Sequence, residues 1–213
     1  MQSIMPHCAK RKIHWDSVYG SHAEQDVSWF ELAPSVSFDL VRLNSNGLTD
    51  SIVDVGGGNS HLVDLLLEAG FSNVRVLDVS SRAIQMAQAR LGQRAREITW
   101  IESDVLEWNG PRDVDIWHDR ATYHFLTDSA DRALYAKVAA RTIVPSGTLI
   151  VETFALEGPR SCSGLPVQRA SAETIQNDFA SDFNLLESFV REHITPTGAR
   201  QLFQVCRLQR KSS

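Results

Sequence analysis

The chain has 213 residues, of which 43% are hydrophobic, and no Pro/Gly/Ser-rich linker divides it, so we expect one domain with one substantial core. The net charge is -5, so the chain lacks the excess of basic residues that nucleic-acid binding usually requires. No apolar run of membrane-spanning length occurs, and the first residues lack the apolar core of a secretory signal. Three scattered cysteines favour reduced thiols over disulfides. We therefore expect a cytoplasmic protein that acts neither on nucleic acid nor at a membrane.

The N-terminal segment combines a polar start with a run of aromatic residues. Residues 1–12 carry Lys10-Arg-Lys12, and we expect them to form a frayed end rather than a binding patch. Five aromatic side chains then stand among polar ones, namely Trp15, Tyr19, Trp29, Phe30 and Phe38. These rings either cap the apolar rim of a sheet or fold over a ligand as a lid.

The middle of the chain alternates between apolar strands and amphipathic helices, which predicts a doubly wound α/β sheet. The expected strands are Ile52–Val55, Val74–Asp78, Ile98–Glu102, Val114–His118 and Thr148–Phe154. Gly70 is a natural C-terminal cap for the helix after the first strand. Ser80 or Ser81 can cap the N-terminus of the helix after the second strand. The helix of residues 129–142 is expected to turn Leu134, Val138 and Ala139 inward.

The last third of the chain begins with a long irregular segment, residues 155–170, followed by a helix near residues 171–180. Two strands, 185–194 and 201–208, are joined only by a short turn containing Pro196 and Gly198. Strands joined so closely must pair antiparallel as a hairpin.

Glycines follow the first strand directly, in the sequence Asp54-Val-Gly56-Gly-Gly58, and the second strand ends at Asp78. Glycines allow the backbone to approach a ligand closely, and a carboxylate at the next strand's end can accept hydrogen bonds from ribose hydroxyls. A dinucleotide fingerprint would need a further glycine where His61 stands, which counts against NAD or FAD. The pattern predicts a site for an adenosyl cofactor.

This segment resembles class I S-adenosylmethionine-dependent methyltransferases, whose acidic-x-Gly-x-Gly core matches Asp54–Gly58; Ser60 stands where many members carry another glycine. The resemblance implies S-adenosylmethionine as cofactor and a Rossmann-like seven-stranded sheet of order 3-2-1-4-5-7-6 with strand 7 antiparallel. It also implies a helical lid in residues 1–45, a cofactor-binding core in 46–155, and a substrate-side loop, helix and hairpin in 156–213.

By this resemblance, Asp78 binds the ribose, Asp104-Val105 the adenine, and the glycine loop the amino-acid end of the cofactor. Trp15 and Tyr19 would cover the ligand, with a cation–π contact to the sulfonium. The expected cofactor-binding residues are Trp15, Tyr19, Asp54, Gly56, Gly57, Gly58, Asp78, Val79, Asp104, Val105 and His118.

The loop after the fourth strand concentrates polar and aromatic residues at the sheet edge where α/β proteins bind ligands. Methyl transfer is an in-line displacement, so a general base is needed only if the nucleophile arrives protonated. The expected catalytic residues are His118, Asp119 and His124, with Asp119 orienting a histidine. Alternatively, Asp119 and Arg120 form a structural ion pair and the rings pack against a helix.

The acceptor is expected to be a small molecule, because the fold uses nearly all of the residues. The expected substrate-binding residues are Trp29, Arg120, Tyr123, Phe154, Cys162 and Arg169. Arg160 or Arg169 would bind an anionic substrate through paired hydrogen bonds. The residues that flank the final hairpin could reach the entrance of the substrate site; they are Arg191, His193 and Arg200. Cys206 is expected in the core. No metal is expected, and the protein is expected to be a monomer or homodimer.

Three alternatives remain open. About 50 residues from Gly58-Asn59-Ser60 onward resemble protein-lysine methyltransferases, although His118-Asp119-Arg120 replaces their acidic-Lys-Gly sequence. Cys162 stands roughly where arsenite methyltransferases have a metalloid-binding cysteine, which suggests a thiol or metalloid acceptor such as arsenite or tellurite. A non-catalytic S-adenosylmethionine-binding protein is the third.

Overall fold

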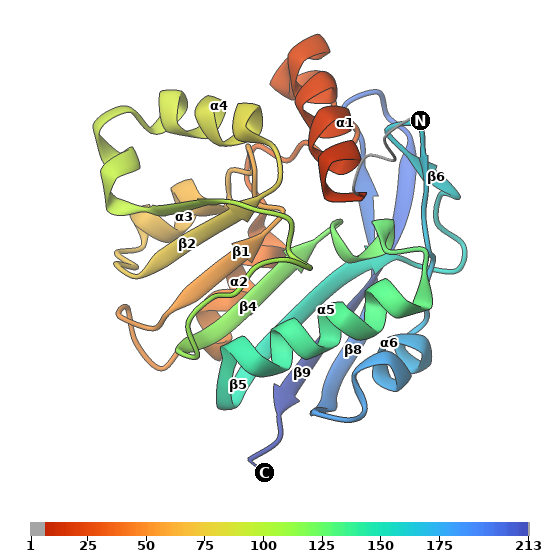
Figure 1. Ribbon diagram of the computed structural model, residues 1–213. Coiled ribbons are helices and arrows are strands. Elements are labelled where there is room, and N and C mark those ends of the chain that lie inside the picture. The colour runs from red at the N-terminus through yellow and green to blue at the C-terminus, as the bar shows by residue number, and fades with distance from the viewer. Residues whose placement is uncertain (1–6, 213) are drawn as a thin grey trace, which may run out of the picture.

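Figure 1 shows the computed structural model, which describes residues 7–212. Seven strands form one mixed sheet in the order β3-β2-β1-β4-β5-β9-β8. The first five strands run parallel, and β9 is antiparallel to both of its neighbours. The predicted strand order, with an antiparallel hairpin at the end of the chain, is therefore confirmed.

The strands lie close to their predicted positions. In the large sheet they are β1 (Ile52–Val55), β2 (Val74–Asp78), β3 (Thr99–Glu102), β4 (Val114–Arg120), β5 (Ile143–Phe154), β8 (Phe183–Ile194) and β9 (Arg200–Arg210). The segment predicted to be irregular holds a small two-stranded sheet of β6 (Ser161–Cys162) and β7 (Leu165–Pro166).

The helices cover both faces of the sheet and one of its ends. They are α1 (His7–Ser21), α2 (Ser35–Asn44), α3 (Leu62–Glu68), α4 (Ser81–Leu91), α5 (Ser129–Thr142) and α6 (Ala172–Phe179), with short 3-10 turns at Glu24–Asp26, Gly92–Glu97 and Tyr123–Phe125. Helices α5 and α6 pack on one face of the sheet and α2 and α3 on the other, while α1 lies across one end (Figure 1).

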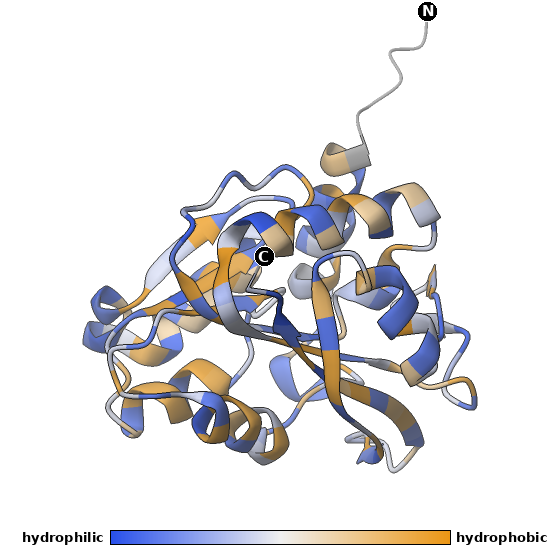
Figure 2. Ribbon diagram, turned by 90° about the horizontal axis from the view of Figure 1, so that it is seen from below, coloured by the Kyte–Doolittle hydropathy of each residue, from blue (hydrophilic) through white to orange (hydrophobic). Residues whose placement is uncertain are grey.

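The outer helices show alternating hydrophilic and hydrophobic segments (Figure 2), as expected of elements with one buried face. Local caps match the sequence prediction: the Ser80 side chain accepts a hydrogen bond from the amide of Ala83, and Gly70 has a φ of 92°. No helix within residues 7–212 is long and apolar enough to cross a membrane.

Three local predictions are wrong. Residues 7–12 are not frayed but belong to α1, whereas residues 1–6 lie outside the described part of the chain. Strand β4 extends beyond His118 to Arg120, because Asp119 pairs with Val151 of β5 and Arg120 pairs with Glu152. Strand β5 begins at Ile143 rather than at the predicted Thr148, and its pairing with β4 shifts at an irregularity between Val114 and Ile116.

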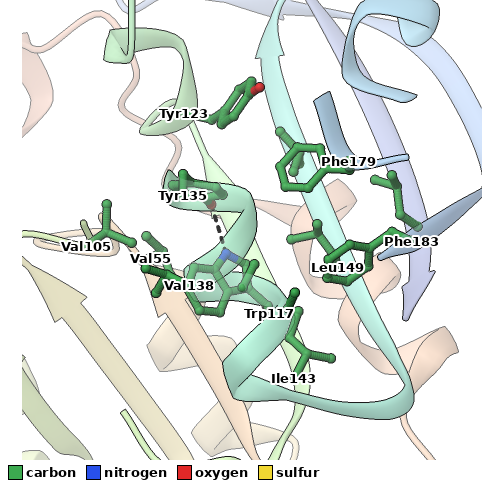
Figure 3. Packing of buried hydrophobic residues seen from close by; sticks show 14 of the residues in the cluster. Val55, Val105, Trp117, Tyr123, Tyr135, Val138, Ile143, Leu149, Phe179 and Phe183 are labelled. Carbon is green, nitrogen blue, oxygen red and sulfur yellow. Dashed lines mark hydrogen bonds between the residues drawn. The ribbon is translucent and has the colours of Figure 1, made fainter. Parts of the chain in front are cut away.

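The prediction for α5 is right for Val138 and Ala139, which are buried, and wrong for Leu134. Leu134 is 43% exposed, and the neighbouring Tyr135 is buried instead. Tyr135 points toward the sheet because its hydroxyl finds partners there: it accepts a 2.8 Å hydrogen bond from Trp117 Nε1, shown in Figure 3, and donates to Asp119. A buried tyrosine usually finds a hydrogen-bond partner, whereas the leucine at the adjacent position needs none.

Candidate active site

A pocket lies at the ends of β1, β2 and β4, and residues of α1 form part of its wall. One part of its wall comes from strand ends and the loops that follow them, including Gly56, Asp78, Val79, Asp104 and Val105. Helix α1 covers it with Arg11, Trp15 and Tyr19. The remaining wall includes Trp29, Arg120, Thr122, Phe125 and Cys162. The topology therefore gathers residues from widely separated segments around one cavity.

The glycine loop allows three side chains to lie close to the backbone. At Gly56, where φ is 66°, a Cβ atom would lie 1.7 Å from the Thr122 hydroxyl oxygen. At Gly58 it would lie 2.6 Å from a carboxylate oxygen of Asp78, and at Gly57 2.5 Å from one of Asp54. Gly56 faces the pocket, whereas Asp54, Gly57 and Gly58 are not part of its wall. Close packing requires glycine at all three positions, and a positive φ also favours it at Gly56 and Gly58.

Asp78 is a buried carboxylate in the pocket wall. Its Oδ1 accepts a 2.7 Å hydrogen bond from the amide of Ser80, which orients the side chain. Burial, followed by the charges of Asp54 and Asp16, raises the pKa of Asp78 to about 7, despite the opposing effect of the Ser80 amide. A strongly perturbed carboxyl group in a pocket is a common feature of functional sites.

Asp104 also lies in the pocket wall, but both of its oxygens already have partners. Oδ2 accepts a 2.9 Å hydrogen bond from Arg11 Nη1, and Oδ1 accepts one of 3.0 Å from the amide of Leu106. Arg11 also pairs with Asp131 at the start of α5. Arg11 was not predicted, although its spacing of four residues from Trp15 would place both on one face of a helix. This arginine fastens α1 to the rim of the pocket.

Four aromatic rings pack together where α1 meets the sheet edge. Trp15 makes edge-to-face contacts with Phe125, at 5.0 Å between ring centroids, and with Trp29, at 5.8 Å. Tyr19 packs edge-to-face on Trp29 at 6.2 Å. Burial, together with the charge of Asp78, raises the pKa of the Tyr19 hydroxyl. The predicted aromatic lid thus corresponds to a real cluster, held together by contacts between three separate segments.

His118 is buried and does not line the pocket. Its Nδ1 lies 2.8 Å from Oδ1 of Asp54, the residue paired with it across β1 and β4. The prediction that Asp119 orients a histidine is wrong, because the adjacent strand residues face opposite sides of the sheet.

Asp119 lies on the other face of the sheet, where it is hydrogen-bonded to groups of the protein itself. It accepts hydrogen bonds from the Tyr135 hydroxyl and from the amides of Thr122 (2.9 Å) and Tyr123 (3.1 Å). Burial raises its pKa to about 6, although these hydrogen bonds oppose the shift. The alternative of an ion pair with Arg120 is also wrong, since Arg120 pairs with Glu31 at 3.8 Å. Asp119 orders the loop that begins after β4.

His124 is fully buried and stacks on Phe154, with 4.6 Å between ring centroids. Burial lowers its pKa to about 3, so the ring is neutral at physiological pH and a weak base. Tyr123 donates a 2.6 Å hydrogen bond to Asp178 in α6. Tyr123, His124 and Phe154 therefore pack the protein and do not line the pocket.

The arginines predicted as anion clamps do not reach the pocket wall. Arg169 donates to the carbonyls of Leu156 and Gly158 within its own loop, and Arg160 is exposed. Of the hairpin residues, Arg191 and His193 form a buried cluster with Glu31, whereas Arg200 pairs with Glu192 on the surface. Cys206 is buried in the core, as predicted.

Comparison with known proteins agrees with this geometry. Residues 52–147, which run from β1 into β5, match a family model described as a methyltransferase domain. The chain carries a class I S-adenosylmethionine-dependent methyltransferase domain. Its reaction is S-adenosylmethionine-dependent methyl transfer, and the cofactor predicted from the sequence is confirmed.

The chain is similar to relatives with different acceptors. It is 23% identical over 201 residues to human (Homo sapiens) EEF1A lysine methyltransferase 2, covering 86% of this chain and 78% of the relative. It resembles 1,6-didemethyltoxoflavin-N1-methyltransferase of Burkholderia thailandensis, solved with 1,6-didemethyltoxoflavin and S-adenosylhomocysteine, at a TM-score of 0.74 and 18% identity, covering 99% and 92% of the two chains. It also resembles the N-methyltransferase NodS of Bradyrhizobium japonicum with S-adenosylhomocysteine, at a TM-score of 0.71 and 17% identity, covering 94% and 98%.

The residues around the pocket fit this cofactor chemically. Asp78 provides a buried acceptor for ribose hydroxyls, and Gly56 permits close approach to the backbone. The rings of Trp15, Tyr19 and Trp29 offer aromatic faces for a sulfonium. Within residues 7–212, no group of three or more His, Cys, Asp or Glu side chains is arranged to hold a metal ion.

Proposed function

We propose that this methyltransferase acts on a small-molecule nucleophile bound beside S-adenosylmethionine in the pocket under α1. In this proposal Asp78 binds the ribose, Val79, Asp104 and Val105 surround the adenine, and Gly56 faces the amino-acid end of the cofactor. The cofactor supplies a methyl group activated by its positive sulfur. The acceptor enters against Trp29, Arg120 and Cys162.

The observation that carries the proposal is the aromatic cover of the pocket. Trp15 packs against both Trp29 and Phe125 within the wall, and Arg11 ties α1 to the opposite rim through Asp104. Such a cover excludes water and restricts the space beside the cofactor, which suits a small acceptor. A small flat molecule can pack against these rings where they line the cavity.

Alignment rather than proton transfer is the main contribution of the protein in this mechanism. His118 in β4 and His124 in the loop after it are buried outside the pocket wall, and the pKa of His124 is lowered to about 3 by burial. Burial also raises the pKa of Cys162, which disfavours its thiolate. We therefore propose an acceptor that reaches the site already nucleophilic, as an amine, thiolate or comparable anion.

Protein-lysine methylation is a second candidate, supported by the 23% identity with EEF1A lysine methyltransferase 2 across 86% of this chain. For such an acceptor, the pocket would have to receive a lysine side chain from outside. A thiol or metalloid acceptor finds support in Cys162, which lines the pocket. The other two cysteines, Cys8 and Cys206, do not line it.

A cofactor-turnover assay tests the proposal. Purified protein is incubated with S-adenosylmethionine and with separate pools of amines, thiols, phenols, carboxylates and metalloid oxyanions, and S-adenosylhomocysteine is measured. A parallel reaction contains recombinant EEF1A and a protein lysate with radiolabelled cofactor. Turnover with at least one small-molecule pool, reduced in Asp78→Ala, supports the proposal. Labelling confined to protein lysines contradicts it in favour of the second candidate.

A further inference from the structure

A cluster of charged side chains is buried behind the pocket. We call it the Glu31 cluster; its members come from the segment before α2 and from β4, β5 and β8, and are Glu31, Arg120, Glu152, Arg191 and His193. All five side chains are at most 14% exposed. Buried ion pairs contribute little net stability because desolvation offsets their attraction. The position of this cluster beside a pocket therefore favours a functional role.

Most charged groups of the Glu31 cluster pair with an opposite charge inside the cluster. Arg191 donates from Nε to Glu152 at 2.6 Å, and from Nη1 and Nη2 to Glu31 at 2.9 Å each. His193 lies between Glu31, at 2.9 Å, and the carbonyl oxygen of Ser28, at 2.7 Å. Burial raises the pKa of Glu31, but the hydrogen bond with His193 and the charges of Arg120 and Arg191 lower it overall to about 2. Glu31 is therefore ionised, and its nearest partners are Arg191 and His193 of β8.

Arg120 is the member that faces the pocket. Its Nη1 donates a 3.1 Å hydrogen bond to the carbonyl of Trp29, and its 3.8 Å distance from Glu31 exceeds that of a hydrogen bond. Within residues 7–212 its guanidinium donates no other hydrogen bond, although it carries five N–H groups. The contacts with Glu31 and Trp29 hold the side chain in place and leave donors available to a ligand.

We propose that Arg120 recognises a carboxylate, or a comparable planar oxyanion, on the acceptor molecule. A guanidinium binds such groups through paired hydrogen bonds, and the low dielectric of a buried site strengthens them. The rings of Trp15, Trp29 and Phe125 share the same cavity. The acceptor class is thus a flat apolar or aromatic molecule that carries an anionic group. This inference rests on the proposed small-molecule function and narrows it.

A binding experiment tests the inference without requiring turnover. Trp15 and Trp29 line the pocket, so ligand binding can be followed by tryptophan fluorescence and by calorimetry. The probes are benzoate, 2-naphthoate and indole-3-carboxylate, each compared with its neutral carboxamide, added to protein saturated with S-adenosylhomocysteine. The variants are Arg120→Met and Arg120→Lys, with Arg160→Met as the control because Arg160 is exposed and outside the pocket.

We expect the wild type and Arg160→Met to bind at least one carboxylate about ten- to a hundredfold more tightly than its carboxamide. Arg120→Met should abolish this preference, whereas Arg120→Lys should retain part of it through charge alone. Circular dichroism checks that each variant is folded. A preference that persists in folded Arg120→Met, equal affinity for the paired probes, or no binding by any probe overturns the inference.

The cofactor also carries a carboxylate, so its binding is measured separately. S-Adenosylhomocysteine is compared with 5′-methylthioadenosine, which lacks the amino-acid end. If Arg120→Met weakens only S-adenosylhomocysteine, Arg120 binds the cofactor's carboxylate and the inference about the acceptor is overturned. Unchanged affinity for both supports it. Failure of every small-molecule pool in the turnover assay would instead count against the proposed function.

Discussion

The two sides of the pocket differ in how they are built. The predicted cofactor side uses two short consecutive segments: β1 with Gly56 directly after it, and β2 with Asp78 at its end. The proposed acceptor side joins Trp29 and Glu31 to Arg120 and to Arg191, which are about 90 and 160 residues further along the chain. The first side follows from a local motif, while the second exists only after β4, β5 and β8 have assembled.

This difference shows that the chemical reactivity of a residue type in the sequence does not predict whether its side chain lines the pocket. His118, Asp119 and His124 belong to the stretch that the sequence marks as chemically reactive, yet all three are buried and outside the pocket wall. Arg120, between them, lies in the wall because β4 extends far enough to bring its side chain there. Variants on each side can test this division.

The largest effect is expected on the cofactor side, from Gly56→Val. The added Cβ would lie 1.7 Å from the Thr122 oxygen at a φ of 66°, so the β4 loop must move and the pocket wall with it. We expect S-adenosylhomocysteine binding to be lost and the melting temperature to fall. Calorimetry and thermal unfolding measure both, and Gly47→Val, where nothing lies within 4 Å, is the control. Normal binding by folded Gly56→Val would place the cofactor elsewhere.

Asp78→Ala should be the next most severe change. Removing a charge-assisted acceptor for the ribose costs about 1.5–3 kcal/mol, or roughly ten- to a hundredfold in affinity. Calorimetry with S-adenosylhomocysteine measures this loss, and Asp39→Ala, on the exposed surface of α2, serves as the control. Wild-type affinity in the Asp78 variant would rule out the ribose contact.

The same carboxyl group predicts a pH dependence. Because burial raises the pKa of Asp78 to about 7, binding below that pH must release a proton if the ionised form accepts the ribose hydroxyls. We therefore expect S-adenosylhomocysteine to bind about tenfold more tightly at pH 8 than at pH 6. For folding, the sign is opposite: a raised carboxyl pKa means that stability falls as pH rises through about 7. Titration calorimetry with Asp78→Asn should give a flatter affinity profile, and an unchanged slope would exclude Asp78 as its source.

A smaller effect is expected from Arg11→Met, which cuts the ties between α1 and Asp104 and Asp131. The pair is partly exposed, so it contributes no more than about 1 kcal/mol, or roughly fivefold in affinity. We expect faster dissociation of S-adenosylhomocysteine in stopped-flow measurements, because the cover opens more readily. Lys10→Met is the matched control on the exposed side of α1. Equal dissociation rates would show that α1 does not limit ligand release.

The smallest effect is expected from His124→Phe. This ring is fully buried, stacks on Phe154 and has a pKa lowered to about 3 by burial, so a phenyl ring should replace it with little change in packing. Once an acceptor is found, kcat and its profile from pH 6 to 9 should stay within about threefold of wild type, compared with the hundredfold or greater loss of a true general base. A loss of that size would restore His124 as the base.

The sequence by itself determined the architecture and the position of the cofactor side. Alternating strand and helix patterns predicted the seven-stranded order, and the glycines with Asp78 pointed to the edge where the pocket lies. These signals are local: hydrophobic periodicity, glycine turns and strand ends act over a few residues.

Only the tertiary structure decided which side chains are buried and which line the pocket. Whether Leu134 or Tyr135 is buried depends on the partners that Trp117 and Asp119 offer from β4. Likewise, Arg11 reaches the pocket through its ion pair with Asp104, and Arg120 is held there by contacts across the chain. A side chain's environment depends on which distant segments pack around it, and sequence spacing does not contain that information.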